Sequence, residues 1–234
     1  MHIFLFLFFL LVSSKNITWT GTHDCYWHNP HNWQPPQIPS SSDNIYIGWN
    51  ATYAPYANKP IYGKLLINTF LLDIYETTAI FSEIENRGDF NVYASTLQTQ
   101  SINNTGRFKI IETLIMVNTF YNLYQVSGQG EIKGRLLNYH TLRLEPNHSL
   151  KITNLIQSKK ANTVIYLGNN TIVADELKLQ GSLYVYSFGL KHVKQEIYKF
   201  RAGDIDVTLV PLNHNTMGNL EIDKNKIFVV LMKN

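Results

Sequence analysis

The chain has 234 residues, of which 44% are hydrophobic and only 16% are charged. Its 20 basic and 17 acidic residues give a net charge of +3, too small an excess for a protein that binds nucleic acid. This composition also excludes a disordered chain. Isoleucine, valine, threonine and aromatic residues are abundant whereas alanine is scarce, and this bias favours strands over helices. The sequence therefore predicts one all-β domain.

The chain opens with an uninterrupted apolar run over residues 3–12. This run is too short to span a bilayer as a helix, and it is followed by the small residues Ser13 and Ser14. We therefore predict a secretory signal peptide over residues 1–14, with cleavage before Lys15. Because no later run is long enough to span a membrane, we expect no transmembrane segment after signal removal and a secreted, extracellular protein.

Cysteine and asparagine patterns agree with export. Cys25 is the only cysteine, which excludes an intramolecular disulfide bond. We expect it to be a small buried side chain or, alternatively, to pair with a second chain. The Asn-x-Ser/Thr pattern of N-glycosylation occurs at Asn16, Asn50, Asn103, Asn147 and Asn169. These sequons are consistent with passage through a glycosylating compartment.

Between about residues 85 and 185, a polar or glycine-containing turn followed by an alternating strand recurs. The first apolar strand residues lie at positions 90, 108, 132, 150, 172 and 183. The first four gaps between these positions are close to the length of one coil of a β-solenoid, about twenty residues, and the last gap is about half as long. A β-sandwich has shorter strand intervals, but second strands between the marked positions allow that architecture as well.

Turn chemistry favours the solenoid. Glycines recur beside other turn-forming residues at Gly88, Gly106, Gly130 and Gly181. We expect these glycines and the neighbouring asparagines at corners where the backbone adopts a positive φ. In such a coil the alternation also predicts that Phe108 points inward and Lys109 outward.

The N-terminal segment differs from the repeat. It contains all four tryptophans, as expected for an aromatic cap over the first coil, whose edge would otherwise be exposed. We predict this cap over residues 15–60 and a β-solenoid with C-terminal closing strands over residues 61–234.

Three segments near the start occur in a recognisable order. They are Thr18-Trp19-Thr20-Gly21, Trp27-His28-Asn29-Pro30-His31-Asn32-Trp33, and Pro39 followed by Asp43-Asn44-Ile45-Tyr46-Ile47. This opening resembles that of secreted right-handed β-helix proteins, an autotransporter- and adhesin-like group of microbial surface proteins. The closing region is also similar to theirs, through Gly181-Ser182-Leu183-Tyr184-Val185 and the last alternating strand. The resemblance implies a right-handed β-helix at a cell surface, and it assigns no catalytic residues.

Metal chemistry finds little support in the sequence. His23, Cys25, His28 and His31 lie within one short segment, but the spacings of zinc fingers and of the HExxH motif are missing. The opening motif accounts for this segment without a metal. We therefore predict no metal site and no cofactor.

Catalytic signatures are equally weak. Glu83 and Glu85 are two residues apart, as are Asp204 and Asp206, so each pair shares one side of a strand. Such a pair is usually a solvated strand face, although glycosidases also need two nearby carboxyls. The sequence contains no GxSxG motif and no phosphate-binding glycine loop. No catalytic residue is assigned, and His140 and His148 are expected at turns or exposed strand positions.

The expected function is a non-enzymatic secreted surface or matrix protein that binds an extracellular glycan or a surface protein. Aromatic residues are the candidate glycan-binding or cap residues, in particular Trp19, Trp27, Trp33 and Trp49. The alternative is a polysaccharide-active lyase or hydrolase on a β-helix scaffold. Self-association through the solenoid ends or Cys25 is a further expectation.

Overall fold

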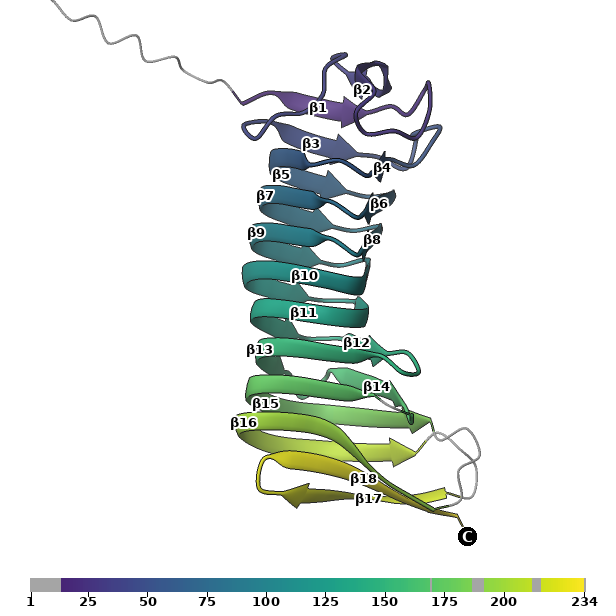
Figure 1. Ribbon diagram of the computed structural model, residues 1–234, viewed down its shortest axis with the longest axis vertical. Coiled ribbons are helices and arrows are strands. Elements are labelled where there is room, and N and C mark those ends of the chain that lie inside the picture. The colour runs from purple at the N-terminus through teal and green to yellow at the C-terminus, as the bar shows by residue number, and fades with distance from the viewer. Residues whose placement is uncertain (1–13, 169, 187–191, 212–215, 234) are drawn as a thin grey trace, which may run out of the picture.

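The chain winds into a β-solenoid of about eight turns of stacked parallel coils (Figure 1). This computed structural model describes residues 14–168, 170–186, 192–211 and 216–233. The predicted all-β solenoid is confirmed, and the alternative of a sandwich is wrong. The predicted signal peptide lies outside the described residues, except for Ser14.

The strands follow one another along the coil. Their bounds are β1 Asn16–Trp19, β2 Trp33–Gln34, β3 Asn44–Ile47, β4 Tyr56–Ala57, β5 Ile61–Asn68, β6 Leu71–Tyr75, β7 Thr78–Asn86, β8 Asp89–Tyr93, β9 Thr96–Asn104, β10 Arg107–Asn122, β11 Gln125–Asn138, β12 Thr141–Leu144, β13 Ser149–Gln157, β14 Asn162–Tyr166, β15 Thr171–Tyr186, β16 His192–Pro211, β17 Thr216–Asp223 and β18 Lys226–Lys233. A short 3₁₀ helix, η1, spans Pro30–Asn32.

Each coil has three sides, and each side pairs in parallel with the same side of the next coil. We call the three resulting surfaces faces A, B and C. Face A contains β6, β8, β12 and β14 with the starts of β10 and β11. Face B contains the starts of β5, β7, β9 and β13 with the middles of β10 and β11. Face C contains β1 and β3, the ends of β5, β7, β9, β10, β11 and β13, and the middle of β15.

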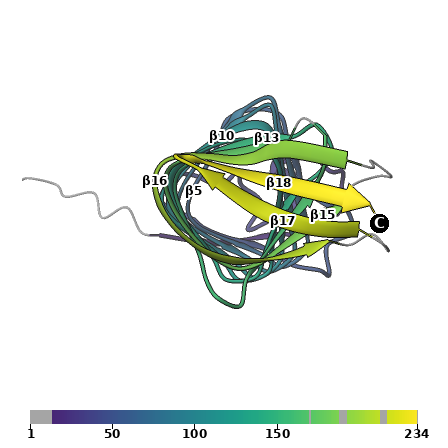
Figure 2. The same cartoon turned by 90° about the horizontal axis from the view of Figure 1, so that it is seen from below.

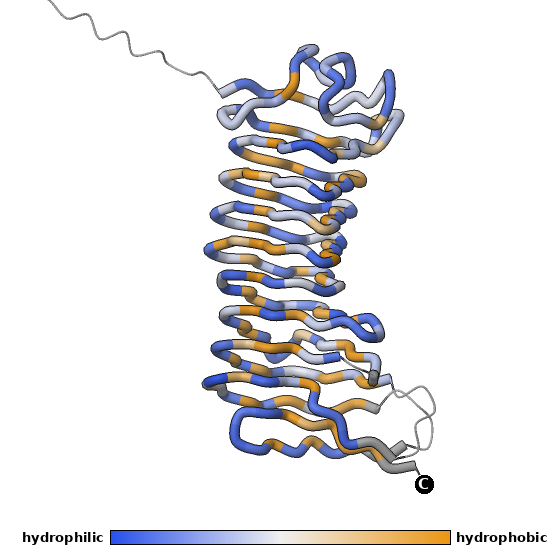
Figure 3. Tube along the Cα trace, viewed as in Figure 1, coloured by the Kyte–Doolittle hydropathy of each residue, from blue (hydrophilic) through white to orange (hydrophobic). Residues whose placement is uncertain are grey.

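The core is built from columns of inward side chains. On face A, Leu72, Phe90, Phe108 and Val126 stand in register and are fully buried. Figure 3 shows the same alternation, with apolar segments recurring at matching places in successive coils. Phe108 is inward and Lys109 outward, as predicted. Alternation along each strand therefore separates the core from the surface.

The coil repeat is most regular in the first half of the solenoid. Phe90 and Phe108 are direct neighbours on face A, which agrees with the predicted spacing. Ile132, however, pairs with Ile115 on face B, so the predicted step from Phe108 to Ile132 passes from one face to the next. The marked positions in the sequence did not form a single column, because all three strands of a coil carry the same alternating pattern.

The expected left-handed corners are only partly where they were predicted. Gly130 and Gly181 do have positive φ values, 147° and 85°. Gly88 and Gly106 do not, and the left-handed corner between faces A and B is instead formed by Glu76, Ala94 and Glu112, with φ of 47°, 46° and 53°. Gly106 is required for a different reason, since a Cβ there would lie 2.1 Å from the carbonyl oxygen of Gly88.

The expectation of a positive φ holds for Asn147, at 61°, but not for the asparagines beside Gly88 and Gly106. A buried row of amide side chains runs along the corner between faces C and A: Asn68, Asn86, Asn104, Asn122, Asn138 and Gln157. Each Nδ2 donates to the amide oxygen of the next coil, at 2.7–3.1 Å. We call this row the amide ladder. It satisfies polar groups inside the coil that would otherwise be costly to bury.

Both ends of the coil carry additional structure. At the N-terminal end, β3 already pairs in parallel with β1 and β5, so parallel stacking begins before residue 60. At the other end, β17 and β18 form an antiparallel hairpin, and β18 also pairs with the start of β16. Viewed along the axis, this hairpin lies across the end of the coil (Figure 2). Three of its inward side chains, Ile227, Val229 and Leu231, are buried.

Candidate functional site

A polar hollow of about 440 Å³ lies on face A. Its lining comes from four successive coils, namely Asp89 and Asn91 on β8, Arg107 and Lys109 on β10, Gln125 and Ser127 on β11, and Arg143 with Glu145 at β12. All of these side chains point outward because they alternate with buried core residues. We call this hollow the face A groove.

Two ion pairs hold the arginines of the groove in place. Arg107 contacts the carboxylate of Asp89 with both Nε and Nη2, each at 2.6 Å. This two-pronged contact raises the pKa of the Arg107 guanidinium above its usual value. Arg143 donates from Nε to Glu145 at 2.7 Å and from Nη2 to the hydroxyl of Tyr166 at 2.7 Å. Both guanidinium groups are therefore oriented before any ligand arrives.

Lys109 differs from the two arginines. Its Nζ lies 5.9 Å from the centre of the Tyr93 ring, and no carboxylate in the described part of the chain forms a salt bridge with it. The Tyr93 ring attracts this cation without neutralising its charge, as a carboxylate would. Lys109 is thus the cation best placed to meet an anionic or hydroxyl-rich ligand in the groove.

Stacked tyrosines lie at both ends of the groove. Tyr75 and Tyr93 are nearly parallel with ring centres 4.3 Å apart, and Tyr166 and Tyr186 repeat this arrangement at 4.6 Å. Burial raises the pKa of Tyr75 to about 12, and burial also raises that of Tyr166. Their hydroxyls therefore stay protonated at neutral pH. Because the rings cover one another, the stacks present edges and hydroxyl groups to a ligand.

An open ring lies at the corner beside the groove. Tyr124 is 45% exposed and its ring centre lies 5.3 Å from that of His140. It directly precedes Gln125 in the chain. A sugar ring that occupied the groove near Gln125 would have this aromatic side chain available for stacking.

The chemistry of the groove suits binding better than bond cleavage. Its two carboxylates, Asp89 and Glu145, are already paired with arginines. They lie three coils apart, and at ~4.8 Å per coil this separates them by roughly 14 Å or more. Paired carboxyls in glycosidases are about 5–10 Å apart.

The four tryptophans divide into two groups. Trp19, Trp27 and Trp33 are buried at the N-terminal end, and the Trp33 ring packs edge-on against the other two at 4.8 and 4.7 Å. The indole nitrogen of Trp33 donates to the carbonyl of Trp27 at 2.7 Å. Trp49 is 77% exposed. Burial gives the first three the position of a cap, and only Trp49 is free to meet a ligand.

The histidines near the opening motif do not converge on one point. The rings of His23 and His31 are 5.2 Å apart, whereas His28 bonds to the carbonyl of Pro60. Cys25 is a free, partly buried thiol. Among the described residues there is no group of three or more His, Cys, Asp or Glu side chains that could hold a metal ion.

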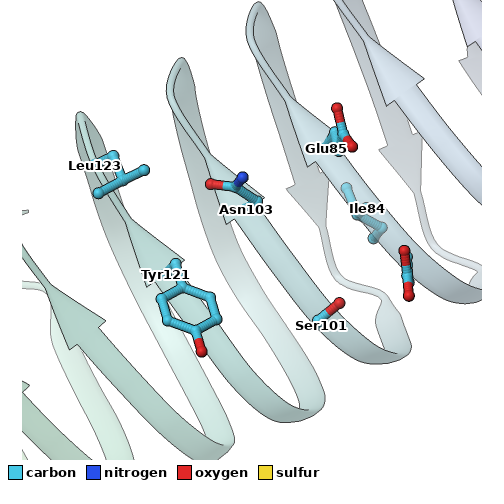
Figure 4. Close-up of a pocket in the computed structure, with 7 residues that line it drawn as sticks. Ile84, Glu85, Ser101, Asn103, Tyr121 and Leu123 are labelled. Atoms are coloured by element: carbon cyan, nitrogen blue, oxygen red, sulfur yellow. The ribbon is translucent and has the colours of Figure 1, made fainter.

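The acidic pairs lie on different parts of the coil. Glu83 and Glu85 line a hollow of about 400 Å³ on face C, together with Tyr121 and Leu123 (Figure 4). Glu85 pairs with Arg87 at 2.8 Å. Asp204 and Asp206 are exposed on β16. The hollow on face C therefore has an acidic side, formed by Glu83 and Glu85, and an apolar side, formed by Tyr121 and Leu123.

The sequons have the accessibility that glycosylation requires. Asn16, Asn50, Asn103 and Asn147 are exposed. Asn169 lies outside the described residues. Occupancy of these sites remains a prediction.

Sequence reasoning missed the groove residues. These residues lie in outward rows. If the sequence of β8 is aligned with that of the start of β10, Asp89 lies beside Arg107 and Asn91 lies beside Lys109. The longer step from Phe108 to Ile132 broke this alignment after the start of β10. The signal was therefore present in the sequence, but the marked positions passed from face A to face B and did not follow these rows.

No family model, curated protein or solved structure matches the chain. In the part of the chain that the structure describes, no helix has the length and apolar character needed to cross a membrane.

Proposed function

We propose that this protein is an exported, non-enzymatic binding module that holds an extended glycan along face A. The observation that carries the proposal is the face A groove, in which hydrogen-bonding side chains from four coils lie between two stacked tyrosine pairs. Glycan sites combine such polar groups with aromatic rings.

The repeat of the solenoid suits a polymer ligand. Successive coils are ~4.8 Å apart, so equivalent side chains recur at this distance along the axis. One sugar of an extended polysaccharide has a similar length, so that each coil would contact one sugar. Preformed ion pairs at Arg107 and Arg143 reduce the entropy lost when a ligand orders its site.

Export and a surface location are supported by the start of the chain. The apolar run at residues 3–12 is typical of a signal peptide. The tryptophan motif resembles the opening of secreted adhesin-like β-helix proteins. A surface protein with an exposed groove is well suited to hold matrix or cell-wall glycans.

A glycan array probed with the purified exported protein tests this function. We expect binding to one class of extended glycan, with loss of binding in Lys109→Ala and in Gln125→Ala. The matched controls are Lys133→Ala and Gln98→Ala, which remove similar outward side chains from face B. Thermal melts of all four variants establish that they remain folded.

The outcomes separate the alternatives. Binding that persists in both groove variants, or absence of binding to any extended glycan, would contradict the proposal. Assays for reducing ends and for unsaturated products are run on the same glycans. Turnover of a bound glycan would instead favour the polysaccharide-active enzyme.

A further inference from the structure

Face C presents apolar side chains on the outside of a parallel sheet. Tyr46 and Tyr121 are 39% and 41% exposed, and Ile67, Leu137 and Ile156 are half-buried in the same outward row. Figure 4 shows that Tyr121 points away from the coil, toward the same side as Asn103 and Glu85. Parallel sheets are usually covered on both faces. The row is interrupted only by Glu85 and Asn103, and its apolar members on both sides of them indicate a surface that is covered in the working protein.

Two unpaired charges flank the centre of this face. Glu83 and Arg135 are both exposed and occupy the same strand position, three coils apart, with Ser101 and Thr119 between them. Neither forms an ion pair with any residue that the structure describes. The two charges thus lie at equal distances on either side of a line between β9 and the end of β10.

We propose that face C binds face C of a second copy of this chain, with the two solenoids antiparallel. The two-fold axis would lie in the interface, parallel to the strands, between β9 and the end of β10. Rotation about this axis leaves the position along a strand unchanged and reverses the order of the coils. Glu83 of each copy then faces Arg135 of the other, which forms two symmetric ion pairs.

The remaining rows match under the same operation. Ile67 of one copy faces Ile156 of the other, and the exposed Lys178 faces Tyr46. These are an apolar contact and a cation–π contact. Glu85 faces Leu137, and its carboxylate is already paired with Arg87 of its own chain at 2.8 Å.

A parallel arrangement of the two solenoids is disfavoured by charge. In that arrangement the two-fold axis runs along the solenoids, so each coil faces its own counterpart and the position along each strand is reversed. With the axis along the row of Glu83 and Arg135, Glu83 would meet Glu83 and Arg135 would meet Arg135, and with the axis between this row and the row of Glu85, Glu83 would meet Glu85. Like charges that face each other in an interface repel and select against that geometry. The order of charges along face C therefore specifies the antiparallel pairing.

The size of the face predicts a weak dimer. Eight coils at ~4.8 Å and four residues at ~3.3 Å cover roughly 500 Å² per copy. Two such faces bury about 1,000 Å², which is at the low end of specific interfaces. Dimerisation should therefore depend on protein concentration.

The proposal requires Asn103 to be free of glycan, although it is a sequon. Its side chain is exposed beside Tyr121 at the centre of the face. A glycan at this position would prevent the two faces from meeting. Mass spectrometry of the exported protein should therefore show Asn103 without a glycan.

Charge reversal with rescue tests the interface. Sedimentation velocity of the purified protein, from low micromolar to several hundred micromolar, should show a monomer–dimer equilibrium. Glu83→Arg and Arg135→Glu should each weaken the dimer by roughly tenfold or more. The double variant should restore it, since the exchanged charges again face each other. Lys133→Glu on face B is the matched control and should leave the dimer unchanged.

Several results would overturn the proposal. They are a wild-type protein that stays monomeric at every concentration, a dimer that survives both single reversals, a double variant no better than the singles, and an occupied Asn103. Because the rescue compares variants with one another, a general loss of stability could not imitate it.

Discussion

Asn86 donates a hydrogen bond from Nδ2 to the Oδ1 of Asn104 at 2.7 Å, across a separation of 18 residues. Asn104 repeats the contact with Asn122 at 2.8 Å, and its Nδ2 also donates to the carbonyl of Gln125 at 2.9 Å. Each amide of the ladder thus joins two coils through its side chain and anchors the turn that follows. The ladder holds successive coils in register at the corner beside the face A groove.

Removal of a central ladder member should destabilise the fold. In Asn104→Ala, the Oδ1 of Asn122 and the carbonyl of Gln125 lose a buried donor. We expect a loss of roughly 2–4 kcal/mol in the free energy of unfolding, measured by denaturant titration. The control is Asn103→Ala in unglycosylated protein, because this neighbour is exposed and should change stability little. Equal losses in the two variants would show that the ladder contributes no stability.

The inward register on face A gives a second prediction. Phe108→Glu would bury a carboxylate in a fully buried position and should cost several kcal/mol. Lys109→Glu places the same charge one residue further, on the outward side, and should change stability by about 0.5 kcal/mol or less. Thermal melts of both variants provide the measurement. Similar melting temperatures for the two would contradict the assigned register.

The sequence was informative where a property depends on neighbouring residues. Alternation alone predicted that Phe108 is inward, because successive side chains along a strand point to opposite sides. The ladder was not predictable in this way. An asparagine before a turn fits an exposed corner as well as a buried one, and only the pairing of Asn86 with Asn104 distinguishes the two. The groove was predictable only in part. The spacing of β8 and β10 places Asn91 beside Lys109, but Arg143 joins the same hollow only after the later coils stack.

Glycine substitution should distinguish a close contact from open space. Gly128 has φ of 115°, and a Cβ there would lie 1.7 Å from the carbonyl oxygen of Ile110. Gly128→Ala should therefore lower the melting temperature strongly, through backbone strain and overlap together. Gly168→Ala is the control, because the nearest atom to its Cβ would be 3.4 Å away. A melting temperature of Gly128→Ala close to that of the control would refute this close packing.

Acid should weaken the N-terminal segment through Asp24. The hydrogen bond from Asn29 is the largest contribution that lowers the pKa of its carboxyl, with further bonds from Tyr26 and Asn32. A lowered pKa stabilises the folded state above the ordinary value of about 3.9, and this contribution is lost as pH falls through the lowered pKa. The stability difference between wild type and Asp24→Asn should therefore be present at neutral pH and vanish in acid. Fluorescence-monitored denaturation across pH measures it.

Asn29→Ala provides the check on this titration. Loss of the largest hydrogen bond should raise the pKa of Asp24 and move the acid transition to higher pH. The same transition in Asn29→Ala and in wild type would show that Asp24 does not control it.

The tryptophan cluster gives the last prediction. Trp33 is buried and packs edge-on against Trp19 and Trp27, so Trp33→Ala would leave a cavity at the end of the coil. We expect a loss of roughly 3–5 kcal/mol, enough to unfold or aggregate a marginally stable domain. Trp49→Ala removes a ring that is 77% exposed and should leave the melting temperature nearly unchanged. Unfolding curves and glycan binding are measured for both variants. Normal stability of Trp33→Ala would sink the cap assignment, whereas loss of glycan binding in a stable Trp49→Ala would move the ligand from face A to the N-terminal end.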